Sequence, residues 1–169
     1  YEFYWTTSAE GFAERMKSEY DKFWNAERRK KAEDLKLSQP EVIILASIVQ
    51  SETVKNDEQP RIAGLYINRL KKGQLLQADP SVKYAVGDFS LKRILNVHLQ
   101  IDSPYNTYKY AGLPPGPINF PEISSIDAVL NYEKHNYLYM CAKEDFSGYH
   151  NFAKTLDEHS RYAAKYHRA

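Results

Sequence analysis

An apolar run that ends in a glutamate constrains this chain more than any other feature. Residues 42–53 read VIILASIVQSET, and Ser38-Gln39-Pro40-Glu41 before them has the pattern of a helix start with proline in the first turn. A helix that is apolar on every side has to be buried. We therefore predict a buried helix that ends near Glu52. Burial would partly desolvate this carboxyl group and raise its pKa towards that of a usable general acid.

Composition limits the functions that need to be considered. The chain has 169 residues, enough for one domain or for one domain with an appended helix. Its 23 basic and 22 acidic residues nearly balance, and no basic stripe alternates with aromatic residues, so nucleic-acid binding is not expected. The chain is rich in tyrosine, with 14 residues. Tyrosine suits sugar faces, although it also suits an ordinary core.

Neither a metal nor another cofactor is expected. The five histidines have no close ligand spacing, and Cys141, the single cysteine, adds no ligand and is predicted to pack in the core. The sequence contains no phosphate-binding loop or dinucleotide fingerprint. It has no apolar stretch long enough to cross a membrane and no signal peptide. The aromatic cluster at residues 1–5 resembles the middle of a strand, and we expect the sequence to be a fragment of a longer protein.

Capping patterns and hydrophobic spacing predict an α+β fold, mostly helical, with a small antiparallel hairpin and a long, ordered loop rich in proline and glycine. Helices are expected from Ser8 into a charged segment at 27–34, and then at 38–52, 58–72, 79–84, 91–96, 124–130 and 155–167. The hairpin would pair 137–142 with 150–153, and the loop would span about 97–123. Residues 1–37 are interpreted as the end of an N-terminal module, with a strand and a connecting helix, and residues 38–169 as a catalytic domain.

Two further regions carry candidate site residues. Asp79 could be a second carboxylate of a glycosidase, or it could only cap the helix that begins at Pro80. Gln77 has no evident structural duty, which favours a ligand contact. In the long loop, prolines would stiffen the segment that contains Tyr105-Asn106-Thr107-Tyr108, and Asn106 could both donate to and accept from sugar groups. The alternative is a loop that packs only on itself.

These segments together resemble the YceG-like (MltG) family of endolytic murein transglycosylases. The matching blocks occur in family order from about residue 40: Leu45–Thr53, Asn68–Leu70, Leu76–Val82, Asp102–Tyr108, Gly112–Ile118, Ser125–Ala128, Tyr137–Tyr139, His150–Phe152 and Thr155–His159. The chain departs from the family pattern at Gln50, where many members have a second glutamate, at Ala78, where threonine is usual, and at Tyr149, where a second glycine is usual. The last change leaves the role of His150 less defined.

The resemblance implies cleavage of the glycan between N-acetylmuramic acid and N-acetylglucosamine without water. Glu52 would protonate the glycosidic oxygen and then take the proton of the muramic 6-hydroxyl, which closes onto C1 to leave a 1,6-anhydro end. One carboxyl group suffices, because the nucleophile belongs to the substrate. The implied substrate-binding residues, besides catalytic Glu52, are Gln77, Asp79, Tyr105, Asn106, Thr107, Tyr108 and His150.

The resemblance also implies a cellular setting. Such an enzyme would act on nascent peptidoglycan strands near the peptidoglycan synthases and limit strand length. A single N-terminal anchor, outside this sequence, would hold it in the cytoplasmic membrane with the catalytic domain facing the periplasm or cell exterior. Two alternatives stay open at this point. One is a hydrolytic muramidase that uses Glu52 and Asp79, and the other is a non-catalytic module that binds glycan.

Overall fold

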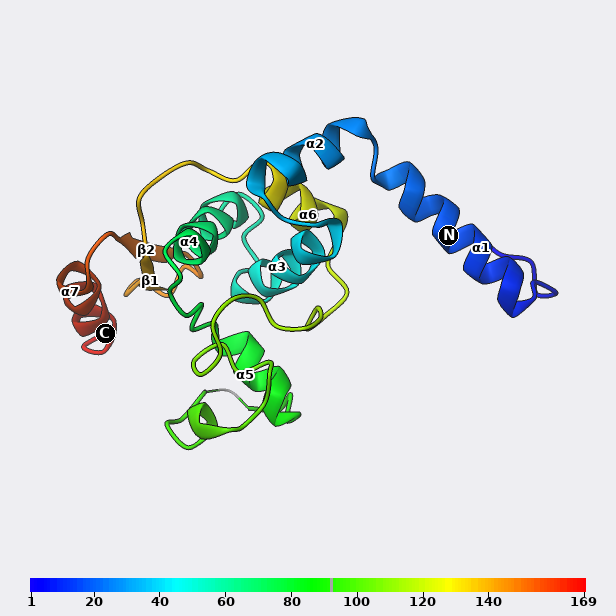
Figure 1. Cartoon of the computed structure of the whole chain (residues 1–169). Coiled ribbons are helices and arrows are strands. Elements are labelled where there is room, and N and C mark those ends of the chain that lie inside the picture. The colour runs from blue at the N-terminus through cyan, green and yellow to red at the C-terminus, as the bar shows by residue number, and fades with distance from the viewer. Residues whose placement is uncertain (92) are drawn as a thin grey trace. The chain divides into compact units, whose positions relative to one another are not determined.

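The computed structural model describes residues 1–91 and 93–169, and it divides into two units, Tyr1–Gln39 and Pro40–Ala169. The first unit holds α1 (Ala9–Phe23) and α2 (Ala26–Leu35) (Figure 1). One long helix is predicted here, but the helix ends at Phe23 and a second one begins at Ala26. Asn25 caps α2 by accepting a hydrogen bond from the backbone of Arg28 at 2.9 Å. The assignment of residues 38–169 as a catalytic domain stays a prediction, because this division says nothing about activity.

One local prediction in the first unit was wrong. Residues 1–5 form no strand, since a strand needs a hydrogen-bonded neighbour and the described residues supply none to this segment. The start predicted at Ser8 is confirmed, because Ser8 is the N-cap of α1 and its side chain accepts from the backbone of Gly11 at 3.1 Å. Thr7 donates its hydroxyl to the carbonyl of Tyr4 at 2.7 Å.

The second unit is built on α3 (Gln39–Glu52), the apolar helix predicted from the sequence. Seven of its residues are buried: Val42, Ile44, Leu45, Ala46, Ser47, Ile48 and Val49. The polar member of this set, Ser47, is satisfied, because it donates to Ile44 O at 2.7 Å and accepts from the backbone N–H of Ile118 at 3.0 Å. The helix thus forms the core and also anchors a distant loop.

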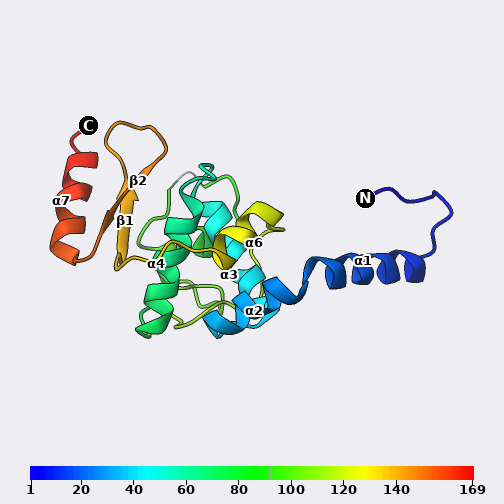
Figure 2. The ribbon, with the colours of Figure 1, turned by 90° about the horizontal axis from the view of Figure 1, so that it is seen from above.

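The remaining elements of the second unit follow the predicted order. They are α4 (Gln59–Lys71), α5 (Asp79–Val86), a 3₁₀ turn at His98–Gln100, α6 (Ile123–Leu130), β1 (Tyr139–Ala142), β2 (His150–Ala153) and α7 (Leu156–Tyr166). The α+β prediction is confirmed, and the hairpin is antiparallel, pairing Tyr139 with Ala153 and Ala142 with His150. Viewed from above, the hairpin and α7 form one side of this unit, next to α4 (Figure 2). Thr155 caps α7 as expected.

A close contact fixes α4 against the strand-like segment that leads to the hairpin. A Cβ on Gly64 would lie 2.3 Å from the carbonyl oxygen of Glu133, so only glycine fits there. One turn later, Asn68 donates to the carbonyl oxygens of His135 at 2.8 Å and Tyr137 at 3.1 Å. These contacts settle where the hairpin begins relative to α4.

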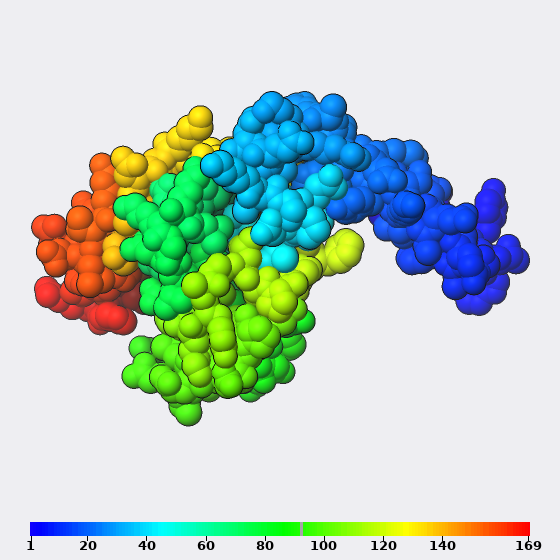
Figure 3. Space-filling view, in the orientation of Figure 1, coloured from blue at the N-terminus to red at the C-terminus, as the bar shows by residue number. Residues whose placement is uncertain are grey.

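The long loop at about 97–123 is ordered. The short helix predicted just before it, at 91–96, is absent from the described residues of that segment. Lys92 lies outside the part of the chain that the structure describes. Ser90 does not cap a helix, because both its backbone N–H and its hydroxyl donate to Asp88. The space-filling view shows α5 and the segment after it, in green to yellow-green, gathered as a lobe of the second unit (Figure 3).

Candidate active site

Glu52 is the last residue of α3, and its carboxyl group is held by α4. The side chain is half-buried, and the hydroxyl of Tyr66 donates to its Oε1 at 2.5 Å. Tyr66 itself is almost wholly buried, with 2% of its surface exposed. Since Tyr66 occupies one carboxyl oxygen, the other oxygen is the one available to a ligand.

The surroundings of Glu52 bring its pKa close to neutral. Its pKa is raised from 4.5 to about 7: burial is the main cause and the negative charge of Asp79 adds to it, whereas the hydrogen bond from Tyr66 and the charge of Arg69 offset part of the rise. A carboxyl group with this pKa is populated in both protonation states near pH 7. It can therefore give a proton and take one back, as general acid–base catalysis requires.

Asp79 does not cap the helix that it begins. The N-cap of α5 is Ala78, which makes no side-chain capping bond, and Asp79 is the first helical residue. Its carboxylate turns away from the helix end and accepts a hydrogen bond from the hydroxyl of Tyr108 at 2.6 Å. The interpretation of Asp79 as a simple cap is thus wrong, because a partner from the long loop holds its side chain.

The chain just before Asp79 is held in an unusual conformation by the same loop. Gln77 has a φ of +53°, a left-handed conformation that is costly for a residue with a side chain. Its backbone N–H donates to Thr107 O at 3.1 Å, and the next N–H, of Ala78, donates to Thr107 Oγ1 at 2.9 Å. Ser81 completes the set with a 2.8 Å hydrogen bond to Thr107 Oγ1. These bonds fix the direction in which Asp79 leaves the loop.

Arg69 supports this segment from α4. Its guanidinium group donates to the carbonyl oxygens of Leu138, Leu75 and Leu76 at 2.6–3.0 Å, and to Gln77 Oε1 at 3.1 Å. Buried arginine needs such a set of acceptors, because an uncompensated charge in the interior is costly. Gln77, predicted to contact a ligand, therefore has its side-chain oxygen occupied by Arg69, although the residue lines the smaller cavity.

The loop residues predicted at the site divide into two groups. Tyr108 lines a cavity beside Glu52, whereas Asn106 and Thr107 are 0% and 1% exposed. Asn106 Nδ2 donates to the carbonyls of Leu99 and Ile101, and its Oδ1 accepts from Tyr108 N, so this side chain builds the loop instead of facing a ligand. Tyr105 packs its ring 4.7 Å from that of Tyr84, which lines the neighbouring cavity.

His150 is tied to the end of a different helix. Glu58, buried just before α4, accepts from the His150 backbone at 2.8 Å and pairs with its Nδ1 at 2.8 Å. Since Glu58 holds one ring nitrogen, Nε2 is the nitrogen that remains for a ligand. His150 lines the same cavity as Tyr108.

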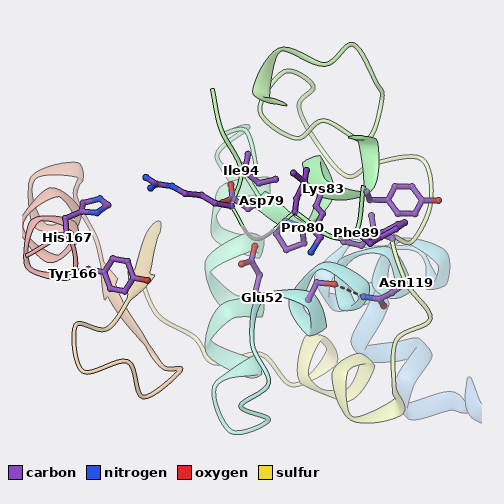
Figure 4. Close-up of a pocket in the computed structure, with 14 residues that line it drawn as sticks. Glu52, Asp79, Pro80, Lys83, Phe89, Ile94, Asn119, Tyr166 and His167 are labelled. Atoms are coloured by element: carbon purple, nitrogen blue, oxygen red, sulfur yellow. Dashed lines mark hydrogen bonds between the residues drawn. The ribbon is translucent and has the colours of Figure 1, made fainter. Parts of the chain in front are cut away.

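Two cavities meet at the two carboxyl groups. The larger, of about 830 Å³, is walled by α5, the segment after it, Ile118, Asn119 and the end of α7 (Figure 4). The smaller, of about 320 Å³, lies among α4, the segment at 76–79, the hairpin and α7. Glu52 and Asp79 line both. A chain-like ligand that passed from one cavity into the other would place an internal bond at this pair.

Several residues of the site carry no functional signal in the sequence. Tyr66 falls within the helix predicted at 58–72, and its hydroxyl holds Glu52. Asn119 donates to Ser47 O at 2.9 Å and Ser51 Oγ at 2.7 Å beside the larger cavity, and its Oδ1 is buried with no partner in the described chain. His159 lines the smaller cavity. Only the tertiary contacts identify these residues, because their sequence neighbourhoods carry no catalytic pattern.

Gln50, at the position where many members of the family have a glutamate, makes hydrogen bonds that serve the fold. Its Oε1 accepts from the backbone N–H of Glu122 at 2.6 Å and from Ser125 Oγ at 3.0 Å. These bonds join α3 to the start of α6. The residue therefore holds the fold on the side of α3 away from the Glu52–Tyr66 contact, and no acid–base role falls to it.

Among residues 1–91 and 93–169, no group of three or more histidine, cysteine or acidic side chains is placed to hold a metal ion. Over the same residues, no helix is both long enough and apolar enough to cross a membrane. Cys141 lies half-buried in β1, and burial raises the pKa of its thiol. The two cavities are lined by carboxyl groups, tyrosine hydroxyls and histidine rings, among other side chains.

Comparison with known proteins finds the same family throughout. The sequence model of the YceG-like family matches residues 1–165. The endolytic murein transglycosylase of Bacillus subtilis (strain 168) is 44% identical over 131 residues, which are 78% of this chain and 36% of that protein. The endolytic murein transglycosylase of Streptococcus pneumoniae (serotype 2, strain D39 / NCTC 7466) is 34% identical over 130 residues, 75% of this chain and 23% of that protein.

A solved structure agrees with these matches. The 2.6 Å crystal structure of the putative yceG-like protein lmo1499 from Listeria monocytogenes superposes with a TM-score of 0.80 at 38% sequence identity, over 95% of this chain and 51% of that one. The chain thus spans about a third or less of the length of the two curated relatives, and about half of the solved chain.

Proposed function

The chain belongs to the YceG-like family, and from this premise we propose that it is the catalytic part of an endolytic murein transglycosylase, a lyase acting on peptidoglycan. The observation that carries the proposal is the position of Glu52. Its carboxyl group, with a pKa of about 7, stands where two cavities meet, so it can reach a bond inside a glycan strand that occupies both. An internal cut is what an endolytic enzyme makes.

The proposed reaction uses Glu52 twice. Its free carboxyl oxygen gives a proton to the glycosidic oxygen, the bond from that oxygen to muramic C1 breaks, and positive charge develops at C1. The Glu52 carboxylate then takes the proton of the muramic 6-hydroxyl, whose oxygen bonds to C1 and forms the 1,6-anhydro ring. The proton balance closes on Glu52, and no water is consumed. The alternation suits a group whose pKa is near neutral.

Asp79 would assist this reaction without bonding to the substrate. Its carboxylate lines both cavities with Glu52 and is held by Tyr108. A fixed negative charge near C1 stabilises the positive charge of the transition state, and the same charge keeps Glu52 protonated in the ground state. Its hydrogen bond with Tyr108 takes up Oδ1, and the residue lines both cavities.

The cellular setting implied by the family forms part of the proposal. We infer a single-pass protein of the cytoplasmic membrane, anchored outside this sequence, whose catalytic part faces the periplasm or cell exterior and shortens nascent strands near the synthases. Membrane fractionation of the full-length protein, with protease access from outside, tests this. Recovery in the soluble fraction, or protection of the catalytic part, would argue against it.

The decisive experiment compares Glu52→Gln with wild type on purified peptidoglycan. Loss of the acid should lower kcat by about a hundredfold to ten-thousandfold, because a positioned general acid contributes that much. Glu14→Gln, on the exposed surface of α1, is the matched control and should leave kcat unchanged. Mass spectrometry of the products should show anhydro ends, which are lighter than reducing ends by one water. Reducing ends alone would indicate a hydrolytic muramidase, and undiminished cleavage by Glu52→Gln would remove Glu52 from the mechanism.

A further inference from the structure

Two cations line the larger cavity without an ion-pair partner in the described chain. Lys83 lies with Asp79 and Pro80 along the α5 wall (Figure 4), and Arg93 lies on the segment after α5. Across residues 1–91 and 93–169, neither has a carboxylate within ion-pair distance. Glu52 and Asp79 line the same cavity, but neither forms an ion pair with these two cations in the described chain, so a ligand can supply an anionic group to them.

The usual partner of Lys83 is engaged elsewhere. Asp79 precedes it by one helical turn, a spacing at which aspartate and lysine commonly pair. In this fold the Asp79 carboxylate instead accepts from Tyr108 at 2.6 Å, and among the described residues Asp79 and Lys83 form no ion pair. The other nearby acid, Asp88, accepts from the backbone and hydroxyl of Ser90, and the charge of Lys83 contributes only to lowering its pKa. Lys83 therefore lines the cavity without an ion pair to either acid.

The rest of the larger cavity is chiefly apolar. Its wall includes Pro80, Tyr84, Phe89, Leu91, Ile94 and Ile118. A ligand that suits it combines an anionic group, placed near Lys83 and Arg93, with apolar surface. N-acetylated sugar rings are uncharged, so they do not supply the anion. The lactyl group of muramic acid does, because it carries a peptide stem with free carboxylates and with aliphatic side chains.

We propose that the larger cavity is the site for this peptide stem and that Lys83, assisted by Arg93, binds one of its carboxylates. The inference rests on the proposed function and names its substrate class: glycan strands that still carry stems. It also sets the direction of the strand. The muramic residue that keeps the anhydro ring lies on the α5 side of Glu52, and the smaller cavity receives the neighbouring N-acetylglucosamine.

The test uses one strand preparation in two forms: uncrosslinked glycan with intact stems, and the same glycan after an amidase has removed the stems and the freed lactyl carboxylates have been converted to amides, so that the stripped strands carry no anion. Wild type should prefer the stem-bearing form. Lys83→Met keeps the aliphatic stem of the side chain and should raise KM about tenfold on stem-bearing strands, the value of one charge-assisted contact, with no change on stripped strands. Lys83→Arg should keep the preference. Lys72→Met, on the exposed end of α4, is the matched control.

Binding is measured separately from cleavage, so that the two proposals can fail independently. In the Glu52→Gln background, fluorescence anisotropy should show tighter binding of labelled stem-bearing strands. Lys83→Met should abolish that difference, and so should high salt, which screens charge contacts. Equal binding of both strand forms, or an equal loss on both with Lys83→Met, would overturn the stem site. A wild-type protein that binds stem-bearing strands selectively but makes no anhydro ends would overturn the transglycosylase proposal and leave the stem site standing.

Discussion

Glu52 and Asp79 line the same two cavities, but different kinds of interaction bring them there. Glu52 comes at the end of a helix whose preceding residues are buried one after another, so apolar packing of α3 positions it. Asp79 follows a short irregular segment whose polar contacts come from Thr107 and Tyr108, about thirty residues later in the sequence. The position of Glu52 is therefore sensitive to changes of side-chain volume in the core, whereas the position of Asp79 is sensitive to the loss of a hydrogen-bond partner.

The two regions also differ in how their surroundings affect the ionised form of the carboxyl group. Burial around Glu52 disfavours its ionised form, and the Tyr66 hydroxyl offsets only part of that cost. Around Asp79, a tyrosine hydroxyl donates directly to the carboxylate, and burial together with this contact raises the pKa of Tyr108, so that it stays protonated. One carboxyl group can thus carry the reacting proton while the other serves as a fixed charge.

The largest expected effect tests the packed region. Ile48 is fully buried in α3, so Ile48→Ala should lower the free energy of unfolding by about 2–5 kcal/mol, through lost burial and the cavity left behind. Val54→Ala, at a site 89% exposed, is the control and should change it little. Urea denaturation followed by circular dichroism gives both values. A loss below about 1 kcal/mol for Ile48→Ala would mean that packing of α3 is not what holds Glu52.

Asp79→Asn tests the fixed charge. It should lower kcat by about tenfold to a hundredfold, with the fold retained, because an amide lacks the charge that stabilises C1. Since the charge of Asp79 raises the pKa of Glu52, the loss of activity above neutral pH should also begin at lower pH. Asp21→Asn on α1 is the control. A pH profile of kcat/KM that does not move would show that Asp79 has no electrostatic influence on Glu52.

Thr107→Val tests the hydrogen-bonded segment with a side chain of nearly equal shape. The backbone N–H of buried Ala78 would lose its acceptor, which should cost about 1–3 kcal/mol of stability. Activity should fall with it, because Asp79 is the next residue. Thermal unfolding and turnover of Thr107→Ser, which keeps the hydroxyl, should stay near wild type, and Thr6→Val at an exposed position supplies the baseline. Equal stability of the valine and serine variants would contradict the role given to this hydroxyl.

Tyr66→Phe should give the smallest change. Its hydroxyl lowers the pKa of Glu52, so its removal should raise that pKa and move the alkaline loss of activity to higher pH. Less precise positioning should reduce kcat by about tenfold or less. The shift is opposite in sign to that of Asp79→Asn, which separates electrostatic effects from general damage. Tyr4→Phe, 87% exposed, serves as the control, and a downward shift for Tyr66→Phe would be inconsistent with the observed hydrogen bond.

Sequence patterns located the elements of the catalytic region well because the patterns are local. Capping residues and helical spacing gave α3, α4 and α7 within a few residues, and alternation around a turn gave the hairpin. The predictions were wrong where a local pattern needed a particular neighbour in the fold to form the expected element. The aromatic residues at 1–5 had β propensity without a strand to pair with, and Ser90 found a carboxylate two residues away and capped no helix.

The same distinction applies to the site residues. The place of Glu52 at the end of a buried helix could be predicted, because the apolar run that precedes it is visible in the sequence. Asn106 is predicted to contact a ligand, because its side chain can both donate and accept hydrogen bonds. The same capacity serves the inside of a loop, and the complete burial of Asn106 shows that it holds the loop together. Tyr66 was missed because its hydroxyl meets Glu52 from another helix.

The sequence by itself determined that α3 is buried, that it ends in a carboxyl group and that the family blocks follow in order, because these properties depend on residues close together in the chain. The tertiary structure alone decided that Asp79 points to Tyr108 and not to its helix end, that two cavities meet at Glu52, and that Lys83 is left without its usual partner. Each of these depends on contacts between residues far apart in sequence. Folding creates such contacts, and no local pattern encodes them.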